Sequence, residues 1–197
     1  MASIKGTETE KNLLAAFAGE SQARNRYTFS AAKAKAEGYI QIAEIFLQTA
    51  GHEKEHAERF FTFLEGGDVE IQAAYPAGFP YQGAPVGNTI ENLKHAAAGE
   101  NLEWTTLYKG FAEKAQEEGF NQVAAQFNAV CVAEKQHEKR YNAVCENVES
   151  GKVFKREPET VWWCINCGYV YEGAEPPKQC PNCKHAQGYF ELIPENW

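Results

Sequence analysis

The sequence lacks the features that would place the protein in a membrane or on a nucleic acid. No segment of its 197 residues approaches the roughly 18 consecutive apolar residues of a membrane-spanning helix. The first twenty residues hold no apolar run followed by a small-residue cleavage site. The net charge is −8 without any basic cluster, which argues against nucleic acid or an anionic membrane surface as a partner. We therefore expect a soluble, cytoplasmic protein.

Two further absences concern chemistry. No Gly-x-Gly-x-x-Gly motif follows a predicted strand, so reduced nicotinamide should act only through a separate reductase. The six cysteines do not form the pattern of a disulfide scaffold, because four of them fall into two Cys-x-x-Cys pairs near the C-terminus. The other two, Cys131 and Cys145, lie in a segment with helical periodicity, and we expect Cys131 to be a small core residue.

Two segments place charged side chains where core residues are expected. Glu53 and His56 are three residues apart and therefore share one face of a helix, and Glu134 and His137 repeat the arrangement. Both pairs continue faces that are otherwise mostly apolar and step by three or four positions. The remaining residues of these faces are Ile42, Phe46, Thr49, Phe60 and Phe63 in the first segment and Val123, Phe127, Val130, Tyr141 and Val144 in the second. One such pair could be a core histidine beside a solvated glutamate. Two pairs at matching phase favour a metal site.

The order of motifs also occurs twice. Ala-Gly-Glu ends at Glu20 and again at Glu100, and Glu-Gly-aromatic occupies 37–39 and 118–120. Two helical hairpins make one four-helix bundle. We expect helices that begin at capping boxes at Thr7 and Asn88, turn at Gly38 and Gly119, and end near Gly66 and Ser150, with a long crossover over 68–87 between the hairpins.

The apolar faces of these helices carry seven potential metal ligands: Glu20, Glu53, His56, Glu100, Glu103, Glu134 and His137. Each desolvated carboxylate costs several kcal/mol, so four or five cost roughly 20 kcal/mol, against a net stability of about 5–15 kcal/mol. The bundle therefore needs cations. Two divalent ions balance four carboxylates, and mixed oxygen and imidazole ligation suits iron or manganese. We expect Glu53 and Glu134 to bridge the two ions.

A second metal site follows a charged linker over 152–159. It consists of Cys164, Cys167, Cys180 and Cys183, whose spacing defines a tetrahedral four-thiolate site. Spacing alone leaves zinc and iron open. Aromatic residues are dense in this short module, at Trp162, Trp163, Tyr169, Tyr171, Tyr189 and Phe190, which argues against a plain zinc ribbon.

The Cys-Gly-Tyr and Cys-Pro turns at Cys167 and Cys180, together with the order of the parts, resemble the rubrerythrin family over nearly the entire chain. The resemblance implies a mainly α fold: a ferritin-like bundle over 1–151, the linker over 152–159 and a small β-rich rubredoxin-like domain over 160–197. It implies two iron ions in the bundle, oxo-bridged when oxidised, and one iron bound by the four cysteines. Rubredoxins usually carry glycine where this chain has Lys184, so we expect altered backbone N–H contacts to the nearby thiolates.

The resemblance also implies an activity, that of a non-haem diiron peroxidase that reduces hydrogen peroxide to water in oxidative-stress defence. Electrons would come from a separate NAD(P)H-dependent reductase or a rubredoxin through the four-cysteine iron, in a head-to-tail homodimer or larger assembly. All seven carboxylate and histidine ligands above would take part, with Tyr27 donating to a ligand carboxylate and one iron exchanging His56 for Glu103 on oxidation.

Two alternatives remain open. A ferroxidase or iron store shares the bundle ligands but needs no incoming electrons, and a zinc-ribbon interaction protein would hold only structural metals. Of the remaining polar residues, Tyr108 is expected near the site, and His52, His95 and His185 lie off the apolar faces and are expected to be exposed.

Overall fold

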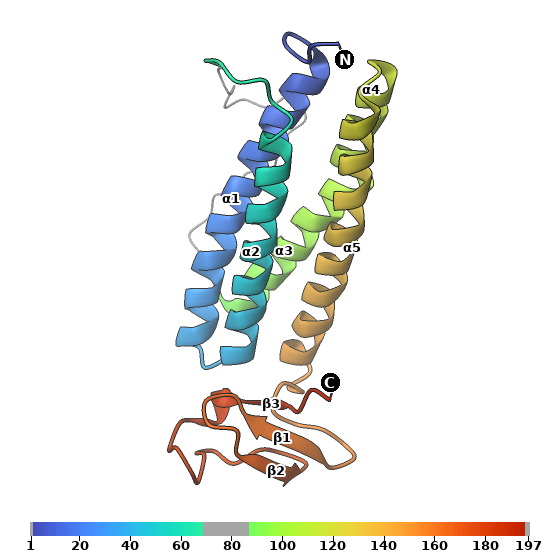
Figure 1. Ribbon diagram of the computed structural model, residues 1–197. Helices are drawn as coiled ribbons and strands as arrows, with labels where there is room; N and C mark the ends of the chain where they lie inside the picture. Colours follow the sequence, from blue (N-terminus) through green and yellow to red (C-terminus); the bar gives the residue numbers. More distant parts are fainter. Residues whose placement is uncertain (1, 69–86, 196–197) are drawn as a thin grey trace.

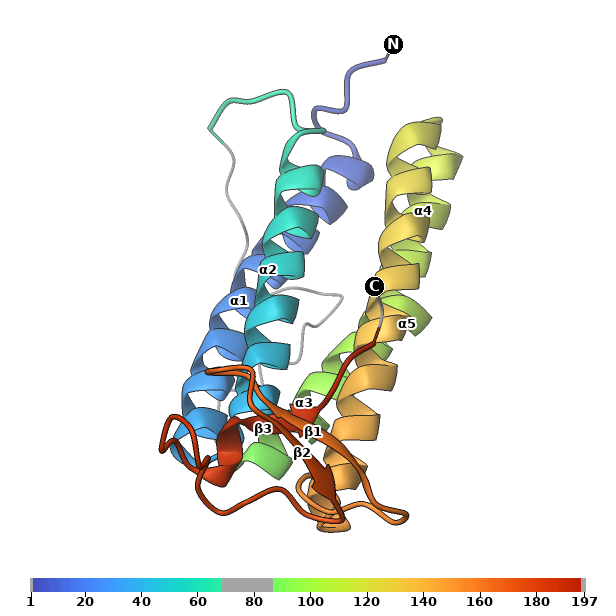
Figure 2. The same ribbon diagram turned by 60° about the horizontal axis from the view of Figure 1, so that its bottom comes forward.

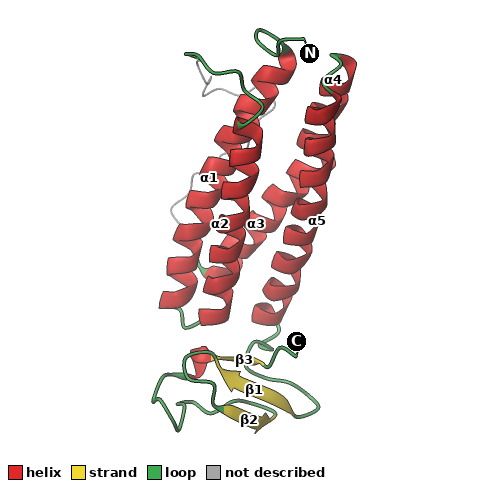
Figure 3. Cartoon of the chain, viewed as in Figure 1, coloured by secondary structure: helices red, strands yellow, loops and turns green. Residues whose placement is uncertain are grey.

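The chain folds into an elongated helical bundle with a small β module at one end (Figures 1 and 3). The computed structural model describes residues 2–68 and 87–195, so the expected crossover lies almost wholly outside the described residues. The helices are α1 (Glu8–Ala36), α2 (Ile40–Phe61), α3 (Thr89–Leu102), α4 (Tyr108–Glu117) and α5 (Asn121–Glu149), with a π-helical turn η1 (Glu103–Leu107) between α3 and α4. Within the described part, no helix is long and apolar enough to cross a membrane.

Each hairpin turns on a glycine, and the residue before that glycine caps the other hairpin. Gly38 and Gly119 have φ of 86° and 84°, in the left-handed region that favours glycine. The Glu118 carboxylate accepts the backbone N–H of Thr9 at 2.9 Å and its hydroxyl at 2.6 Å. Glu37 accepts the same two groups of Thr89, at 3.0 and 2.6 Å. The repeated motif therefore joins the two hairpins by equivalent contacts.

The helix ends follow the sequence expectations with two differences. The capping box at Asn88 is complete, whereas at Thr7 the side chain accepts from Glu10 N but the Glu10 carboxylate returns to the N–H of Gly6 at 2.7 Å. Helix α2 ends at Phe61 rather than near Gly66. The α-helical hydrogen bonds end there, because the N–H groups of Phe63 and Leu64 bond only three positions back, to the carbonyls of Phe60 and Phe61 at 3.3 and 3.1 Å.

The sequence predicts one continuous helix from the capping box at Asn88 to the turn at Gly119. This prediction is wrong, because η1 divides that segment into α3 and α4. The repeat explains the interruption. Seven positions separate Glu20 from Tyr27, but eight separate Glu100 from Tyr108. A π-turn bonds over five positions and so absorbs one additional residue; the Tyr108 N–H accordingly donates to the carbonyl of Glu103. Beyond η1 the second hairpin is again in register with the first.

The β module is a three-stranded antiparallel sheet of order β2-β1-β3. Its strands are β1 (Thr160–Cys164), β2 (Val170–Gly173) and β3 (Phe190–Leu192), and a short 3₁₀ turn η2 (Gln187–Tyr189) precedes β3. Trp162 is fully buried at its centre and donates its indole N–H to the carbonyl of Gly173 at 2.9 Å. Its core neighbours are Cys164, Cys180 and Phe190, so the small core also positions two thiols.

The module rests against the end of the bundle where α1 turns into α2 (Figure 2). In the segment between α5 and the module, Phe154 stacks on Tyr39, with ring centroids 6.2 Å apart and planes inclined by 4°. Gly188 lies so close to Gly38 that an added Cβ would stand 2.1 Å from the Gly38 carbonyl oxygen. A side chain at this position would therefore push the module away from the bundle.

Candidate metal centres

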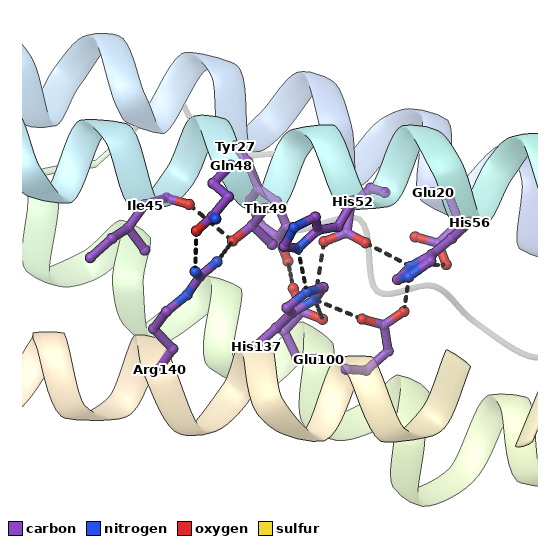
Figure 4. Close-up of polar contacts among 12 residues, drawn as sticks. Glu20, Tyr27, Ile45, Gln48, Thr49, His52, His56, Glu100, His137 and Arg140 are labelled. Atoms are coloured by element: carbon purple, nitrogen blue, oxygen red, sulfur yellow. Dashed lines mark hydrogen bonds and ion pairs between the residues drawn. The ribbon is translucent and has the colours of Figure 1, made fainter. Parts of the chain in front are cut away.

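Six of the expected ligands converge in the middle of the bundle (Figure 4). They come from four helices and form two overlapping sets, in each of which the ligand atoms lie within 4.8 Å of one another: Glu20, Glu53, His56 and Glu134 in one, and Glu53, Glu100, Glu134 and His137 in the other. Glu53 and Glu134 belong to both sets. This is the arrangement expected for two carboxylates that bridge a pair of ions.

The two histidines approach the shared carboxylates in matching ways. Nδ1 of His56 lies 2.9 Å from Glu134 Oε1 and 3.0 Å from Glu53 Oε2. Nδ1 of His137 lies 2.8 Å from Glu134 Oε2 and 3.4 Å from Glu53 Oε1. Each histidine thus faces a different oxygen of each shared carboxylate.

The protein alone leaves these groups unsatisfied. Among the residues that the structure describes, eight of their buried atoms have no hydrogen-bond partner: Glu20 Oε2, both oxygens of Glu53 and of Glu134, Glu100 Oε2, and Nδ1 of His56 and of His137. Burial raises the pKa of Glu20 to about 8 and those of Glu53 and Glu134 well above the ordinary range, and it lowers the pKa of His56 to about 3. Ionised carboxylates with neutral imidazoles require bound cations here, and the donor set fits two divalent ions.

Two tyrosines each donate a hydrogen bond to a carboxylate of the other hairpin. The hydroxyl of Tyr108 donates to Glu20 Oε1 at 2.6 Å, and that of Tyr27 donates to Glu100 Oε1. Both rings are buried. Each hydroxyl therefore occupies one oxygen of a carboxylate ligand, and the other oxygen, Oε2 of Glu20 or of Glu100, has no hydrogen-bond partner in the described part of the chain.

Two residues near the site depart from the simple picture. Glu103 is buried at the start of η1 but belongs to neither ligand set. His52 is half-buried, so the expectation of exposure was wrong; its Nδ1 lies 3.0 Å from Nε2 of His137. The sequence signal for this position was the spacing, because His52 lies four residues, or one helical turn, before His56.

The other two histidines that were expected to be exposed lie away from this site. His185 is half-buried, with its ring against Tyr189, whereas His95 is exposed as expected.

The four cysteines come together in the β module. All four sulfur atoms lie within 4.8 Å of one another, and the Cys164–Cys183 and Cys167–Cys180 pairs are each 3.7 Å apart. A tetrahedron with metal–sulfur bonds of about 2.3 Å has edges of about 3.8 Å, so one ion fits. Burial raises the pKa of Cys164 to about 12, and the backbone N–H of His185 lowers that of Cys183 to about 5.

The residue after the last cysteine, Lys184, has a backbone conformation that glycine usually adopts. Lys184 has φ of 63°, in the left-handed region, and its backbone N–H donates to the carbonyl of Cys180 at 3.0 Å. Its ammonium group folds back onto the carbonyl of Pro181 at 2.7 Å. The backbone at Lys184 thus adopts a conformation that glycine favours.

Comparison with known proteins shows the family. The family model described as Rubrerythrin matches residues 11–145, and that described as Rubrerythrin, rubredoxin-like domain matches residues 162–191. The chain belongs to the rubrerythrin family. The rubrerythrin of Porphyromonas gingivalis is 57% identical over 99% of this chain and 94% of its own length. That of Nitratidesulfovibrio vulgaris is 51% identical over the full length of both chains.

The solved structures agree with this assignment. Fully reduced, all-ferrous nigerythrin superposes with a TM-score of 0.61 at 30% identity, covering 97% of this chain and 92% of that one. The mainly helical, ferritin-like fold with a small antiparallel sheet at the C-terminal end is therefore confirmed. The cofactors are those of the rubrerythrin family, with two iron ions for the carboxylate and histidine cluster and one iron for the four-cysteine cluster.

Proposed function

We propose that this chain is a peroxidase that reduces hydrogen peroxide to water with electrons that enter through the four-cysteine iron. The observation that carries the proposal is the presence, in one chain, of two ligand sets that share Glu53 and Glu134 and of a separate four-thiolate site. Each peroxide consumes two electrons and two protons and yields two waters. When bound, two ferrous ions supply those electrons, and the four-cysteine iron replaces them one at a time.

We assign the chain's own residues to distinct tasks. Glu53 and Glu134 would hold both ions, Glu20 and His56 would hold one, and Glu100 and His137 would hold the other. Buried aromatic rings, among them Phe46, Phe60, Phe127 and Tyr141, enclose the site and exclude bulk water. We divide the chain into the diiron bundle over 1–151, a linker over 152–159 and the four-cysteine domain over 160–197.

The placement of the module supports electron transfer between subunits. The module touches the bundle at Gly38, and Glu53 lies fifteen residues further along the chain. At 1.5 Å per residue this is about 20 Å along α2, a long path for an electron within one chain. We therefore propose a head-to-tail homodimer or larger assembly, in which the module of one subunit serves the bundle of another. The first donor is a separate NAD(P)H-dependent reductase or a rubredoxin.

The test begins with metal content and a visible spectrum of the purified protein. Ferric iron bound by four thiolates absorbs strongly and is red, whereas zinc is colourless. The iron-loaded protein is then fully reduced without oxygen, and one equivalent of hydrogen peroxide is added. We expect stoichiometric loss of peroxide and return of the red colour as the four-cysteine iron gives up its electron. If the peroxide is consumed while the four-cysteine iron stays ferrous, the protein is an iron-handling protein instead.

A further inference from the structure

We propose that His52 is a positioning residue that fixes His137 as a permanent metal ligand, and that His56, which has no such partner, is thereby left as the exchangeable one. The inference rests on the metal pair of the proposed function. It concerns a residue outside both ligand sets, and it follows from the contacts of one imidazole ring.

The two nitrogens of His137 face different surroundings (Figure 4). Nδ1 points at the carboxylates, 2.8 Å from Glu134 Oε2 and 3.4 Å from Glu100 Oε2. Nε2 lies 3.0 Å from Nδ1 of His52. The two ring planes are inclined by only 14°, with centroids 5.1 Å apart. A separation that long between nearly parallel rings, with nitrogens in contact, means that the rings meet edge to edge, as an N–H donor and an in-plane lone pair do.

The direction of this hydrogen bond follows from metal binding. A neutral imidazole carries one hydrogen, and the nitrogen that binds a metal must offer its lone pair. With Nδ1 of His137 toward the metal position, the hydrogen resides on Nε2 and is donated to Nδ1 of His52. His52 then carries its own hydrogen on Nε2. The bond holds His137 in one tautomer and one ring orientation, which is what a hydrogen bond to the remote nitrogen of a ligating histidine does.

The internal repeat shows that this device is present only once. His52 lies four residues before His56 on α2, and the equivalent position four residues before His137 on α5 is Ala133. An alanine methyl group cannot accept a hydrogen bond. Over residues 2–68 and 87–195, Nε2 of His56 makes no hydrogen bond to a side chain. The metal position served by His137 is therefore the rigid one, and the position served by His56 is free to change ligands.

Metal affinity tests the proposal without any turnover. The full chain, with its four-cysteine iron retained and its bundle emptied by a chelator, is titrated with Co²⁺ in a calorimeter. Four proteins are compared: the wild type, His52→Leu, His52→Asn and the control His95→Leu, which removes an exposed histidine from α3. Asparagine keeps an acceptor oxygen close to the position of the histidine Nδ1, and leucine does not.

We expect His52→Leu to weaken one of the two cobalt sites by about 10–100-fold and to leave the other at its wild-type affinity. His52→Asn should restore most of the loss, and His95→Leu should change neither site. Wild-type affinity of His52→Leu at both sites would overturn the proposal. So would equal weakening of both sites, or failure of His52→Asn to restore binding, because either result indicates a merely structural role.

A second readout uses the unmodified protein and does not depend on the folding of a variant. In the cobalt-loaded wild type, the imidazole N–H protons of the two ligating histidines give shifted proton NMR signals. We expect one of these protons, on His137, to exchange slowly with water because it is hydrogen-bonded to His52, and the other, on His56, to exchange fast. Two equally fast protons would refute the inference. Neither readout involves peroxide. The inference about His52 can therefore fail while the peroxidase proposal holds, and the peroxidase proposal can fail while the inference about His52 holds.

Discussion

The hydroxyl of Tyr108 lies 2.6 Å from Oε1 of Glu20, so a residue of the second hairpin orients a carboxylate of the first. Tyr27 makes the reciprocal contact with Glu100. Each hairpin thus carries one carboxylate ligand that accepts a hydrogen bond from a tyrosine of the other hairpin. Assembly of the bundle and formation of the metal site are therefore coupled, as they are in other proteins in which binding free energy contributes to folding.

Removal of either hydroxyl should weaken metal binding. Tyr108→Phe leaves both oxygens of Glu20 free of a donor in a buried site, and Tyr27→Phe does the same to Glu100. We expect each to lower ferrous-ion affinity by about 10–100-fold, measured by calorimetry on chelator-treated protein. Tyr171→Phe in the β module is the control and should have no effect. Unchanged affinity in both bundle variants would show that the crossed contacts do not orient ligands.

Glu134 should be required for both ions, because its two oxygens face the two ligand sets separately. We predict that Glu134→Ala lowers the occupancy of both iron positions, measured by anomalous diffraction from crystals grown with ferrous iron. The matched variant Glu20→Ala removes a member of one set only and should empty chiefly that position. Retention of one fully occupied position in Glu134→Ala would count against bridging.

Oxidation should exchange one ligand of the pair. In this structure His56 belongs to the ligand set of Glu20, whereas Glu103, at the start of η1, belongs to neither set. The first copy of the repeat has Ala23 at the position equivalent to Glu103. A ferrous ion among four carboxylates prefers a neutral imidazole, and the higher charge of a ferric ion favours an additional anion. Crystal structures of the reduced and peroxide-oxidised protein should show His56 bound in the first and Glu103 in the second, with His137 bound in both. His56 bound at an unmoved iron in both states would exclude the exchange.

Electron transfer between subunits predicts that two inactive chains can complement each other. One variant would carry Glu53→Ala and Glu134→Ala and so lack bundle iron, and the other would carry Cys164→Ser and so lack the electron-carrying iron. Each alone should be inactive, and a mixture refolded together should recover part of the peroxidase rate. The refolded mixture must first be shown to contain heterodimers. Inactivity of such heterodimers would mean that electrons stay within one chain.

Much of this architecture could be predicted from the sequence because local rules and the repeat agree. The Glu-x-x-His pairs identify their helix faces through spacing alone, and Asn88 and Glu91 form the capping box that their spacing indicates. The turns at Gly38 and Gly119 needed only the left-handed preference of glycine. In each case the signal lies within one helical turn.

The features that were missed depend on contacts between helices or on counting across the repeat. The π-turn was visible only as the change from seven to eight positions between the glutamate and the tyrosine that both copies contain, Glu20 with Tyr27 and Glu100 with Tyr108. His52 lies off its own apolar face, and its role depends on a residue 85 positions away on another helix. No periodicity within one helix carries that information.

The central claim is that the four-cysteine iron feeds electrons to the bundle. The measurement that tests it most directly is the steady-state rate of peroxide reduction with NADH and an added reductase, in protein whose bundle carries iron. The account predicts turnover by the all-iron full chain and its loss in two forms, a chain that ends at Ser150 and a full chain with zinc in place of the four-cysteine iron. The zinc form keeps the tetrahedral site and removes only its redox chemistry. Turnover at the full rate by the zinc form would contradict the account.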